Sequence, residues 1–334
     1  MQTARLIFSL FIATALAAAA FAADNNKTYA TPDEAKTDPD FAVQGEYVGE
    51  YTEDNQTQKV GVQIIALGDG RFHGRAYPGG LPGDGWNGEK GHEGDGQRGD
   101  DGAVVLKDSE NHKAVIKDGV ATFYNPDGKK FGEAKKVERK SPTLGAKPPA
   151  GAKVLFDGTE QSLANWKGAT MTGDGLLVQG VTSVPTFQSQ TLHVEFRTPY
   201  MPHARGQGRG NSGLYLQGRY EVQMLDSFGL AGKNNECGGI YSIKDPDVNM
   251  CFPPLAWQTY DVEYTAARYD ADGKKTANAK MTVRHNGVVV HQGVELPKST
   301  TAAPVKESPE PGPVYLQNHG NPVRYRNIWV VAKE

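Results

Sequence analysis

The sequence RGNSGLYLQGRYEVQMLDS, residues 209–227, decides how the rest of the chain is interpreted. It opens with a turn rich in Gly, Asn and Ser and continues into two short segments with the composition of strands. In the second segment apolar residues alternate with polar ones, with Tyr220, Val222 and Met224 set against Glu221 and Gln223. Successive side chains of a strand point to opposite faces of a sheet. The alternation therefore predicts one face on an apolar core and one that carries a carboxylate and an amide.

Polar strand faces recur at two more places in the sequence. The segment LHVEFR at 192–197 alternates in the same way. A stretch near the C-terminus, with VYLQNH at 314–319 and VRYRN at 323–327, places further polar groups beside strands. A single polar face is ordinarily a solvated outer surface. Recurrence in three separated stretches instead favours a β-sandwich that holds a sugar on one polar, concave sheet, although a function has to be argued from the site itself.

Three ordered motifs resemble one known family. GNSGLYLQGRYEVQ at 210–223, LFDG at 155–158 and LQNHGNPVR at 316–324 are similar to the 3-keto-disaccharide hydrolase domain family. The resemblance covers residues 153–333 and implies a concanavalin-like jelly-roll β-sandwich there. It carries no information about residues 31–140.

Composition predicts an all-β protein with two domains. The chain has 334 residues, a formal net charge of −3, 40 glycines and 20 prolines. The length allows two domains, and many turn residues with few long apolar runs favour strands. A nucleic-acid partner would require a basic surplus, which the charge excludes.

The domain boundaries follow from local patterns. Short strand patterns joined by turns, such as Lys59–Leu67 and Arg71–Tyr77 around an Asp-Gly turn, predict a small β-rich N-terminal domain at 41–140. The glycine-rich stretch 83–102 is expected to be a loop. A Pro/Gly/Ala-rich linker at 141–152 leads to the sandwich at 153–334. The linker predicts that a chain starting near Lys147 folds alone.

The first 22 residues have the pattern of an export signal. Arg5 is followed by the apolar run 6–19 and by an Ala-x-Ala cleavage pattern at 20–22. This apolar run is shorter than the ~20 residues that a membrane span needs. The sequence therefore predicts a cleaved signal peptide, a periplasmic or secreted protein with no membrane span in the mature chain, and a flexible polar leader at 23–40. Cys237 and Cys251, the only two cysteines, are predicted to form a disulfide in such a compartment.

Paired carboxylates are the catalytic groups that the residues themselves suggest. The sequence has no Gly-x-Ser-x-Gly elbow and no His-Glu-x-x-His motif, and Ser212 has no evident base. Glu221 and Asp226 lie five residues apart, which puts them on opposite faces unless a bulge or a strand end intervenes. Glu195 is the alternative partner of Glu221 across the sheet. Two such groups can act as acid and base in glycoside cleavage.

The family resemblance implies a different route, because the family's substrates are disaccharides oxidised at C3. A base removes the C2 proton, which the ketone acidifies, the glycosidic oxygen leaves C1, and water adds back. Glu221 and His319 are the base and acid candidates in either order, although His319 can equally be a turn residue. The enolate would be stabilised by Arg219, Arg324 and Arg326, or by a divalent metal ion on Glu195, Glu221 or His319.

Two hypotheses follow, both with a carbohydrate as the partner. The first is an exported enzyme that cleaves 3-keto-glycosides, and the second is a non-catalytic carbohydrate-binding sandwich. A binding protein would rely on aromatic platforms, whereas the inferred face is rich in ionisable groups, which favours the enzyme. The candidate sugar-binding residues are Arg197, Asn211, Gln217, Arg219, Gln223, Tyr241, Gln317, Arg324 and Arg326.

Overall fold

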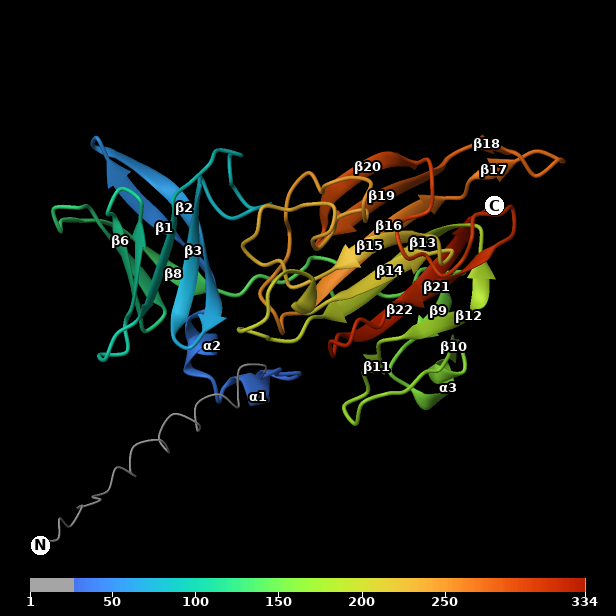
Figure 1. Cartoon of the computed structure of the whole chain (residues 1–334), viewed down its shortest axis with the longest axis horizontal. Coiled ribbons are helices and arrows are strands. Elements are labelled where there is room, and N and C mark those ends of the chain that lie inside the picture. Colours follow the sequence, from blue (N-terminus) through green and yellow to red (C-terminus); the bar gives the residue numbers. More distant parts are fainter. Residues whose placement is uncertain (1–26, 334) are drawn as a thin grey trace, which may run out of the picture.

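The computed structural model of the protein describes residues 27–333, which form two β-rich units in succession (Figure 1). The predicted signal peptide at 1–22 and the first residues of the leader lie outside the described residues. Within 27–333 no helix combines the length and the hydropathy that a membrane span requires. The all-β prediction is confirmed, since the only helices are three short α-helices and one 3₁₀ turn in this part of the chain.

The N-terminal unit is a closed barrel of antiparallel strands, in which each strand pairs with the next and the last pairs back on the first. Its strands are β1 (Gly45–Glu53), β2 (Gln56–Gly68), β3 (Arg71–Pro78), β4 (Glu93–Arg98), β5 (Val104–Asp108), β6 (Lys113–Lys117), β7 (Val120–Tyr124) and β8 (Lys130–Val137). Closure leaves no unpaired strand edge. Large apolar side chains, including Tyr47, Ile64 and Phe72, belong to one buried cluster of this unit.

The glycine-rich stretch 83–102, which the sequence analysis expects to be a loop, contains strand β4. Alternate glycines allow the pairing with β5. A Cβ atom at Gly94 would lie 2.6 Å from the Lys107 carbonyl oxygen, and one at Gly96 would lie 1.8 Å from that of Val105. Both contacts are far inside van der Waals distance, so glycine is required wherever the two backbones approach this closely.

The C-terminal unit is a sandwich of two antiparallel sheets. The five-stranded sheet has the order β10 (Trp166–Lys167), β12 (Val181–Phe187), β21 (Gly312–Leu316), β14 (Ser212–Leu216) and β15 (Tyr220–Met224). The seven-stranded sheet has the order β11 (Leu177–Val178), β22 (Arg324–Lys333), β13 (Ser189–Arg197), β16 (Gln258–Thr265), β19 (Ala279–His285) and β20 (Val288–Leu296), with β9 (Lys153–Phe156) also paired to β22. A separate ribbon joins β17 (Arg268–Tyr269) to β18 (Lys275–Ala277), and α3 (Glu160–Leu163) follows β9.

The core of the sandwich lies between the two sheets, as the alternation predicts. The inward residues of β13 are Leu192, Val194 and Phe196, and those of β15 are Tyr220, Val222 and Met224. All six side chains are at most 1% exposed. Each of these apolar side chains is worth about 1.5–3 kcal/mol when it is fully buried, so the pattern fixes the register of both strands.

The described part of the predicted flexible leader is folded. Residues 27–43 form α1 (Pro32–Ala35) and α2 (Pro39–Val43), and Thr31 and Glu34 make a reciprocal capping box at the start of α1. The backbones of Tyr29 and Tyr200 exchange two hydrogen bonds of 3.0 Å, which joins this segment to the sandwich. The prediction of flexibility is therefore wrong for residues 27–40.

The linker 141–152 begins as an ordered strap on the outer face of the seven-stranded sheet. The Ser141 hydroxyl lies 2.6 Å from that of Thr259, and the Gly145 N–H donates to a carboxylate oxygen of Glu195 at 2.6 Å. The side chain of Asn327 donates to the Ala146 carbonyl at 3.0 Å. These bonds fix the direction in which the chain leaves the barrel.

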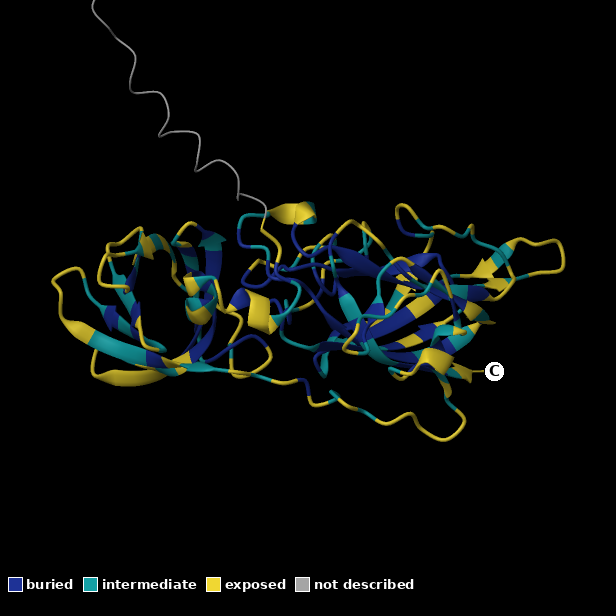
Figure 2. Ribbon diagram, turned by 90° about the horizontal axis from the view of Figure 1, so that it is seen from below, coloured by how far each residue is buried: buried dark blue, intermediate teal, exposed yellow. Residues whose placement is uncertain are grey.

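The barrel and the sandwich share a buried interface (Figure 2). Ile65 points out of β2 into the apolar cluster of the sandwich and is 6% exposed. Arg139 binds Glu46 at 2.6 Å and lies over the ring of Phe252, 5.1 Å from its centroid. A chain that starts at Lys147 would lack these partners, so the contacts argue against the prediction that the sandwich folds alone.

The predicted disulfide between Cys237 and Cys251 is not present, and both residues are free, fully buried thiols. The Cys237 sulfur lies 3.2 Å from the Tyr260 hydroxyl, and the Cys251 thiol donates to the Leu225 carbonyl at 3.5 Å. The two side chains therefore act as small core residues, the role in which free cysteine is commonly buried.

We expect Ile65→Ala to weaken the interface without disturbing the interior of the barrel, because Ile65 faces outward. Loss of a buried Ile side chain costs about 2–5 kcal/mol. Urea unfolding followed by intrinsic fluorescence should show that loss, and the transitions of the two units should separate. Val48→Ala, at an exposed position of β1, is the matched control and should change little. Wild-type stability in Ile65→Ala would show that the interface contributes nothing.

Candidate functional site

Three side chains form a row across the outer face of the five-stranded sheet. Tyr315 on β21 pairs with Tyr215 on β14, and Tyr215 pairs with Glu221 on β15. Their neighbours Leu214 and Val222 face the core, so by the period of two the row faces away from it. The apolar alternation of β14 and β15 thus places two phenols and one carboxyl next to each other.

The carboxyl group of Glu221 is fixed on both sides. One of its oxygens accepts a hydrogen bond from the Tyr215 hydroxyl at 2.8 Å. The other lies above Gly213, where a Cβ atom would be 2.1 Å away from it, so only glycine leaves space at this position. The backbone of Glu221 is also held, since its N–H donates to Thr300 and its carbonyl accepts from the Tyr241 N–H.

Burial changes the acidity of this carboxyl. Glu221 is 2% exposed, although a polar strand face is ordinarily solvated. Burial raises the pKa of Glu221 to about 7, although the hydrogen bond from Tyr215 acts in the opposite direction. A group with such a pKa exists in both protonation states at neutral pH, which suits general acid or base catalysis. Burial, together with the charge of Glu221, raises the pKa of Tyr215.

Partly exposed side chains surround the buried carboxyl. The Gln317 amide donates to the Tyr215 hydroxyl at 3.3 Å. The rings of Tyr215 and Tyr315 lie 5.4 Å apart at an angle of 48°. The backbone N–H of Tyr241 donates to the Glu221 carbonyl at 3.2 Å, which places Tyr241 beside the row. Gln317, Tyr315 and Tyr241 are each of intermediate burial, so a ligand can reach the edge of the row.

A cluster of amides continues the site beyond Gly213. The side chain of Gln223 donates to Gln207 at 3.0 Å, and that of Asn211 donates to the Gln207 carbonyl at 2.8 Å. The Oδ1 atom of Asn211 is buried and accepts no hydrogen bond from any residue in 27–333. A buried acceptor without a donor is costly unless water or a ligand supplies one. This oxygen therefore has the capacity to accept a further hydrogen bond.

Four of the predicted site residues lie on the other sheet, with the sandwich core between them and Glu221. Glu195, Arg197, Arg324 and Arg326 belong to β13 and β22 of the seven-stranded sheet. Arg197 donates to the Ala30 carbonyl at 3.2 Å, and Arg324 donates to Gln179 at 2.7 Å. The structure therefore does not bring them together with Glu221.

Glu195 has a structural role in holding the linker. Its carboxylate accepts hydrogen bonds from Arg326 at 2.7 Å, from Asn327 at 2.8 Å and from the Gly145 N–H at 2.6 Å. Burial alone would raise the pKa of Glu195, but these bonds and one from His193 lower it to about 2. A carboxylate that is ionised so firmly cannot act as the acid partner of Glu221 at neutral pH.

Asp226, Arg219 and Gln217 are also bound in structural contacts. Asp226 forms a buried ion pair of 2.6 Å with Arg209, after the end of β15. Arg219 donates to the Gln217 side chain at 2.9 Å and to the carbonyls of Lys306 and Glu310. The same Gln217 oxygen accepts from the core hydroxyl of Tyr264 at 2.7 Å. These contacts fix the β14–β15 turn against residues 306–310.

His319 lies in the exposed loop after β21 and makes no hydrogen bond to any residue that the structure describes. The predicted metal ligands Glu195, Glu221 and His319 are therefore not assembled, because Glu195 faces the opposite side of the sandwich. Within residues 27–333, the cluster of metal-ligating side chains that does form lies in the barrel.

Sequence reasoning missed Tyr215, Tyr315 and Gln207. The signal for the two tyrosines was present, because the alternation of β15 also holds for SGLYL at 212–216 and for GPVYL at 312–316. Applied to all three strands, the period of two puts both phenols on the face of Glu221. No pattern marks Gln207, which lies in a 3₁₀ turn (Gly206–Gly208) and reaches the site through the fold.

Comparison with known proteins identifies the family of the sandwich. The sequence profile of the family described as 3-keto-alpha-glucoside-1,2-lyase-like domain matches residues 151–331. The chain belongs to this family. No curated protein matches the chain.

Three solved structures that are similar to part of the chain come from Parabacteroides distasonis ATCC 8503. One protein, provisionally described as a glycosyl hydrolase, is 30% identical with a TM-score of 0.50, over 55% of this chain and 85% of its own. Two others with the same description are 18% identical, with TM-scores of 0.40 and 0.38, over 55% of this chain and 95% and 99% of their own. The family and the first of these relatives support a carbohydrate-active enzyme that cleaves glycosides.

We expect Glu221→Gln to alter stability in a pH-dependent manner. The pKa of Glu221 in the folded protein, about 7, lies above its ordinary value of 4.5. The stability that the neutral carboxyl contributes is fully present below about pH 4.5 and is lost as the pH rises through 7. The difference corresponds to about 3 kcal/mol, at about 1.4 kcal/mol for each pH unit. Because Gln stays neutral, the variant should gain stability relative to wild type as the pH rises from 4.5 to 8.

Urea unfolding at pH 4.5, 6 and 8 measures this difference. Glu160→Gln, at an exposed position of α3, is the control and should show no comparable trend. A constant offset between Glu221→Gln and wild type at all three pH values would contradict the assigned burial of the charge.

Proposed function

We propose that the protein cleaves the glycosidic bond of sugars oxidised at C3, and that Glu221 transfers the proton. The observation that carries this proposal is the row of Tyr315, Tyr215 and Glu221, in which a buried carboxyl has its pKa raised to about 7. Membership of the lyase-like family supports the same substrate class.

The reaction requires one proton transfer from carbon. Ionised Glu221 accepts the C2 proton, and the electron pair of the C2–H bond moves toward the C3 ketone and forms an enolate. The C3 carbonyl then re-forms, the C1–C2 double bond forms and the bond from C1 to the glycosidic oxygen breaks. The second sugar leaves through this oxygen, which takes a proton from a donor or from water. Water then adds across C1–C2. A base with a pKa near the working pH is the most effective for the first step.

Neighbouring groups suit the charge that develops in this step. The Tyr215 hydroxyl donates to Glu221 and so stabilises its ionised form. The Gln317 amide and the hydroxyls of Tyr241 and Tyr315 are further hydrogen-bond donors on residues next to Tyr215 and Glu221. Donors of this kind can stabilise the oxygen of a C3 enolate. The unpaired Oδ1 of Asn211 can accept a sugar hydroxyl.

A two-carboxylate glycosidase mechanism is less well supported. It requires a second carboxyl group about 5–9.5 Å from the first. Of the two partners that the sequence suggests, Glu195 lies on the other sheet and Asp226 is bound to Arg209. Elimination with the single carboxyl of Glu221 needs neither of them.

Carbohydrate binding without catalysis is the second candidate function. The partly exposed rings of Tyr241 and Tyr315 give this face aromatic surface, and aromatic rings are what a binding protein uses. Binding of the substrate without turnover would favour this alternative. In either case we propose export to the periplasm or the medium, on the basis of the predicted signal at residues 1–22.

We expect the wild type to cleave a 3-keto-disaccharide and to leave the unoxidised disaccharide intact. Glu221→Gln should lower kcat by roughly 10²–10⁴-fold, since it removes the base but keeps the shape of the side chain. The kcat/KM of the wild type should rise with pH around an apparent pKa near 7. In D₂O the 3-keto sugar that is formed should carry deuterium at C2, which direct hydrolysis does not introduce.

The control variant is Glu160→Gln, which should turn over normally. Normal kcat in Glu221→Gln would remove this residue from the mechanism. Cleavage without deuterium at C2 would exclude elimination while leaving a glycoside-cleaving enzyme.

A further inference from the structure

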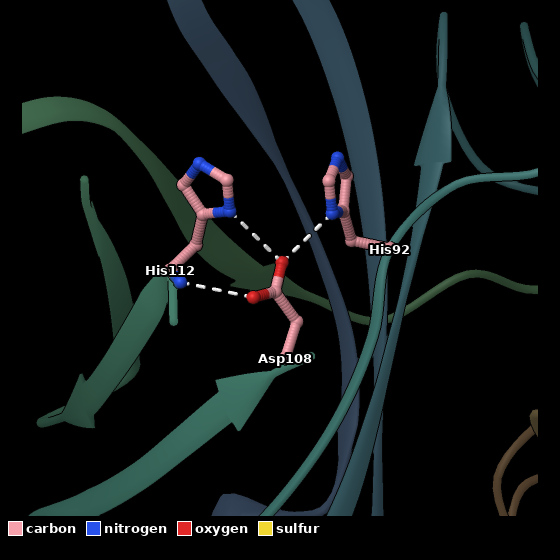
Figure 3. A group of neighbouring side chains, drawn as sticks. All are labelled: His92, Asp108 and His112. Carbon is pink, nitrogen blue, oxygen red and sulfur yellow. Dashed lines mark hydrogen bonds and ion pairs between the residues drawn. The ribbon is translucent and has the colours of Figure 1, made fainter. Parts of the chain in front are cut away.

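Two histidines and one aspartate converge at one end of the barrel, far in sequence from the sandwich motifs (Figure 3). His92 precedes β4, Asp108 ends β5 and His112 precedes β6. The Nδ1 atoms of His92 and His112 lie 2.8 Å and 3.0 Å from the same oxygen, Oδ2 of Asp108. The ligand atoms of all three residues lie within 4.8 Å of one another.

The carboxylate of Asp108 is held in place by its own turn. Its other oxygen, Oδ1, accepts from the backbone N–H groups of Glu110 and His112, each at 2.9 Å. The Asp108 side chain is 8% exposed. The turn therefore uses one oxygen of the carboxylate and directs the second toward the two imidazole rings.

The two rings are presented to this oxygen in different ways. The His112 ring packs edge-on against Phe131, with centroids 6.0 Å apart, and its side chain is 29% exposed. The His92 side chain is 61% exposed and lies 5.3 Å from the His112 ring. His112 and Asp108 are thus fixed by packing and hydrogen bonds, whereas His92 is free to adjust.

We propose that His92, Asp108 and His112 form a binding site for a divalent transition-metal ion, with zinc as the representative ion. Two imidazole nitrogens and one carboxylate oxygen are donors that zinc prefers, while magnesium and calcium prefer oxygen ligands alone. On binding, each neutral ring carries its proton on Nε2 and offers its Nδ1 lone pair to the metal.

The geometry requires only a small adjustment. Bonds of about 2.1 Å that meet at a tetrahedral angle place neighbouring ligand atoms about 3.4 Å apart. The two nitrogen–oxygen separations are 2.8 Å and 3.0 Å, so each opens by about half an ångström when an ion replaces the hydrogen bonds. The exposed His92 ring can supply most of this movement.

The site borders a large cavity in the barrel. All three residues line a cavity of about 1140 Å³, whose apolar walls include Val62, Leu106 and Phe131. Three protein ligands leave a tetrahedral ion with one open position, the arrangement that accepts a water or an oxygen of a bound molecule. The metal site therefore gives the barrel a point at which a small oxygen-bearing ligand can be held.

The same barrel contains a natural control. His73 on β3 and Asp95 on β4 form one His–carboxylate contact of 2.9 Å, similar to each half of the proposed site. No second histidine joins this pair among the described clusters of metal-ligating side chains. If an isolated His–Asp contact were sufficient to bind zinc, this pair would bind it as well.

The test is zinc titration of the full chain by isothermal calorimetry, with cobalt(II) absorption as a measure of coordination. We expect one ion per chain, tetrahedral cobalt bands, and no saturable binding of magnesium or calcium at this site. His92→Gln and Asp108→Asn should each weaken zinc binding at least ~10-fold, the smallest loss usual even for groups outside the ligand shell. His73→Gln should bind like the wild type.

Folding is controlled within the same series. Asp108→Asn keeps the Oδ1 acceptor of its turn, and His92 is exposed, so both variants should retain the wild-type circular dichroism. Zinc should raise the melting temperature of the wild type and of His73→Gln, and not that of the two site variants. Absence of saturable zinc binding to the wild type, or undiminished affinity in His92→Gln, would overturn the proposal. Equal losses in His73→Gln and His92→Gln would also overturn it.

Discussion

The burial of one face of β15 between the two sheets is the constraint on which the sandwich and its site depend. Tyr220, Val222 and Met224 are all at most 1% exposed in the core. Because a strand alternates with a period of two, their burial fixes Glu221 on the opposite face. The absence of a side chain at Gly213 then leaves room for the carboxyl, and Tyr215 in the same row provides its hydrogen bond.

Polar groups serve different purposes on the two outer faces of the sandwich. On the five-stranded sheet, the carboxyl of Glu221 has one protein hydrogen-bond donor, and its pKa is raised to about 7 by burial. On the seven-stranded sheet, Glu195 receives several donors, its pKa is lowered to about 2, and it holds the linker. The larger number of hydrogen-bond donors around Glu195 is what lowers its pKa, whereas burial outweighs the single donor at Glu221.

The barrel is attached to the sandwich by more than its covalent connection. The strap at residues 141–146, the outward side chain of Ile65 and the contact of Arg139 with Phe252 all join the two units. The cavity and its histidines lie at the other end of the barrel, beside the β1–β2 turn. The two candidate sites are therefore separate, and each is held by its own hydrogen bonds and packing contacts.

The sequence by itself determined the all-β class, the two units, the apolar faces of the strands and the position of Glu221 away from the core, because these follow from local composition and a period of two. It also marked the family through motifs that lie within single strands and turns. It did not determine which sheet each strand joins, so Glu195, Arg324 and Arg326 were grouped with Glu221 although the core separates them. The burial of the Glu221 carboxyl, the free thiols of the two cysteines and the meeting of His92 with Asp108 and His112 were decided by the tertiary structure, because they depend on contacts between segments whose pairing no local pattern encodes.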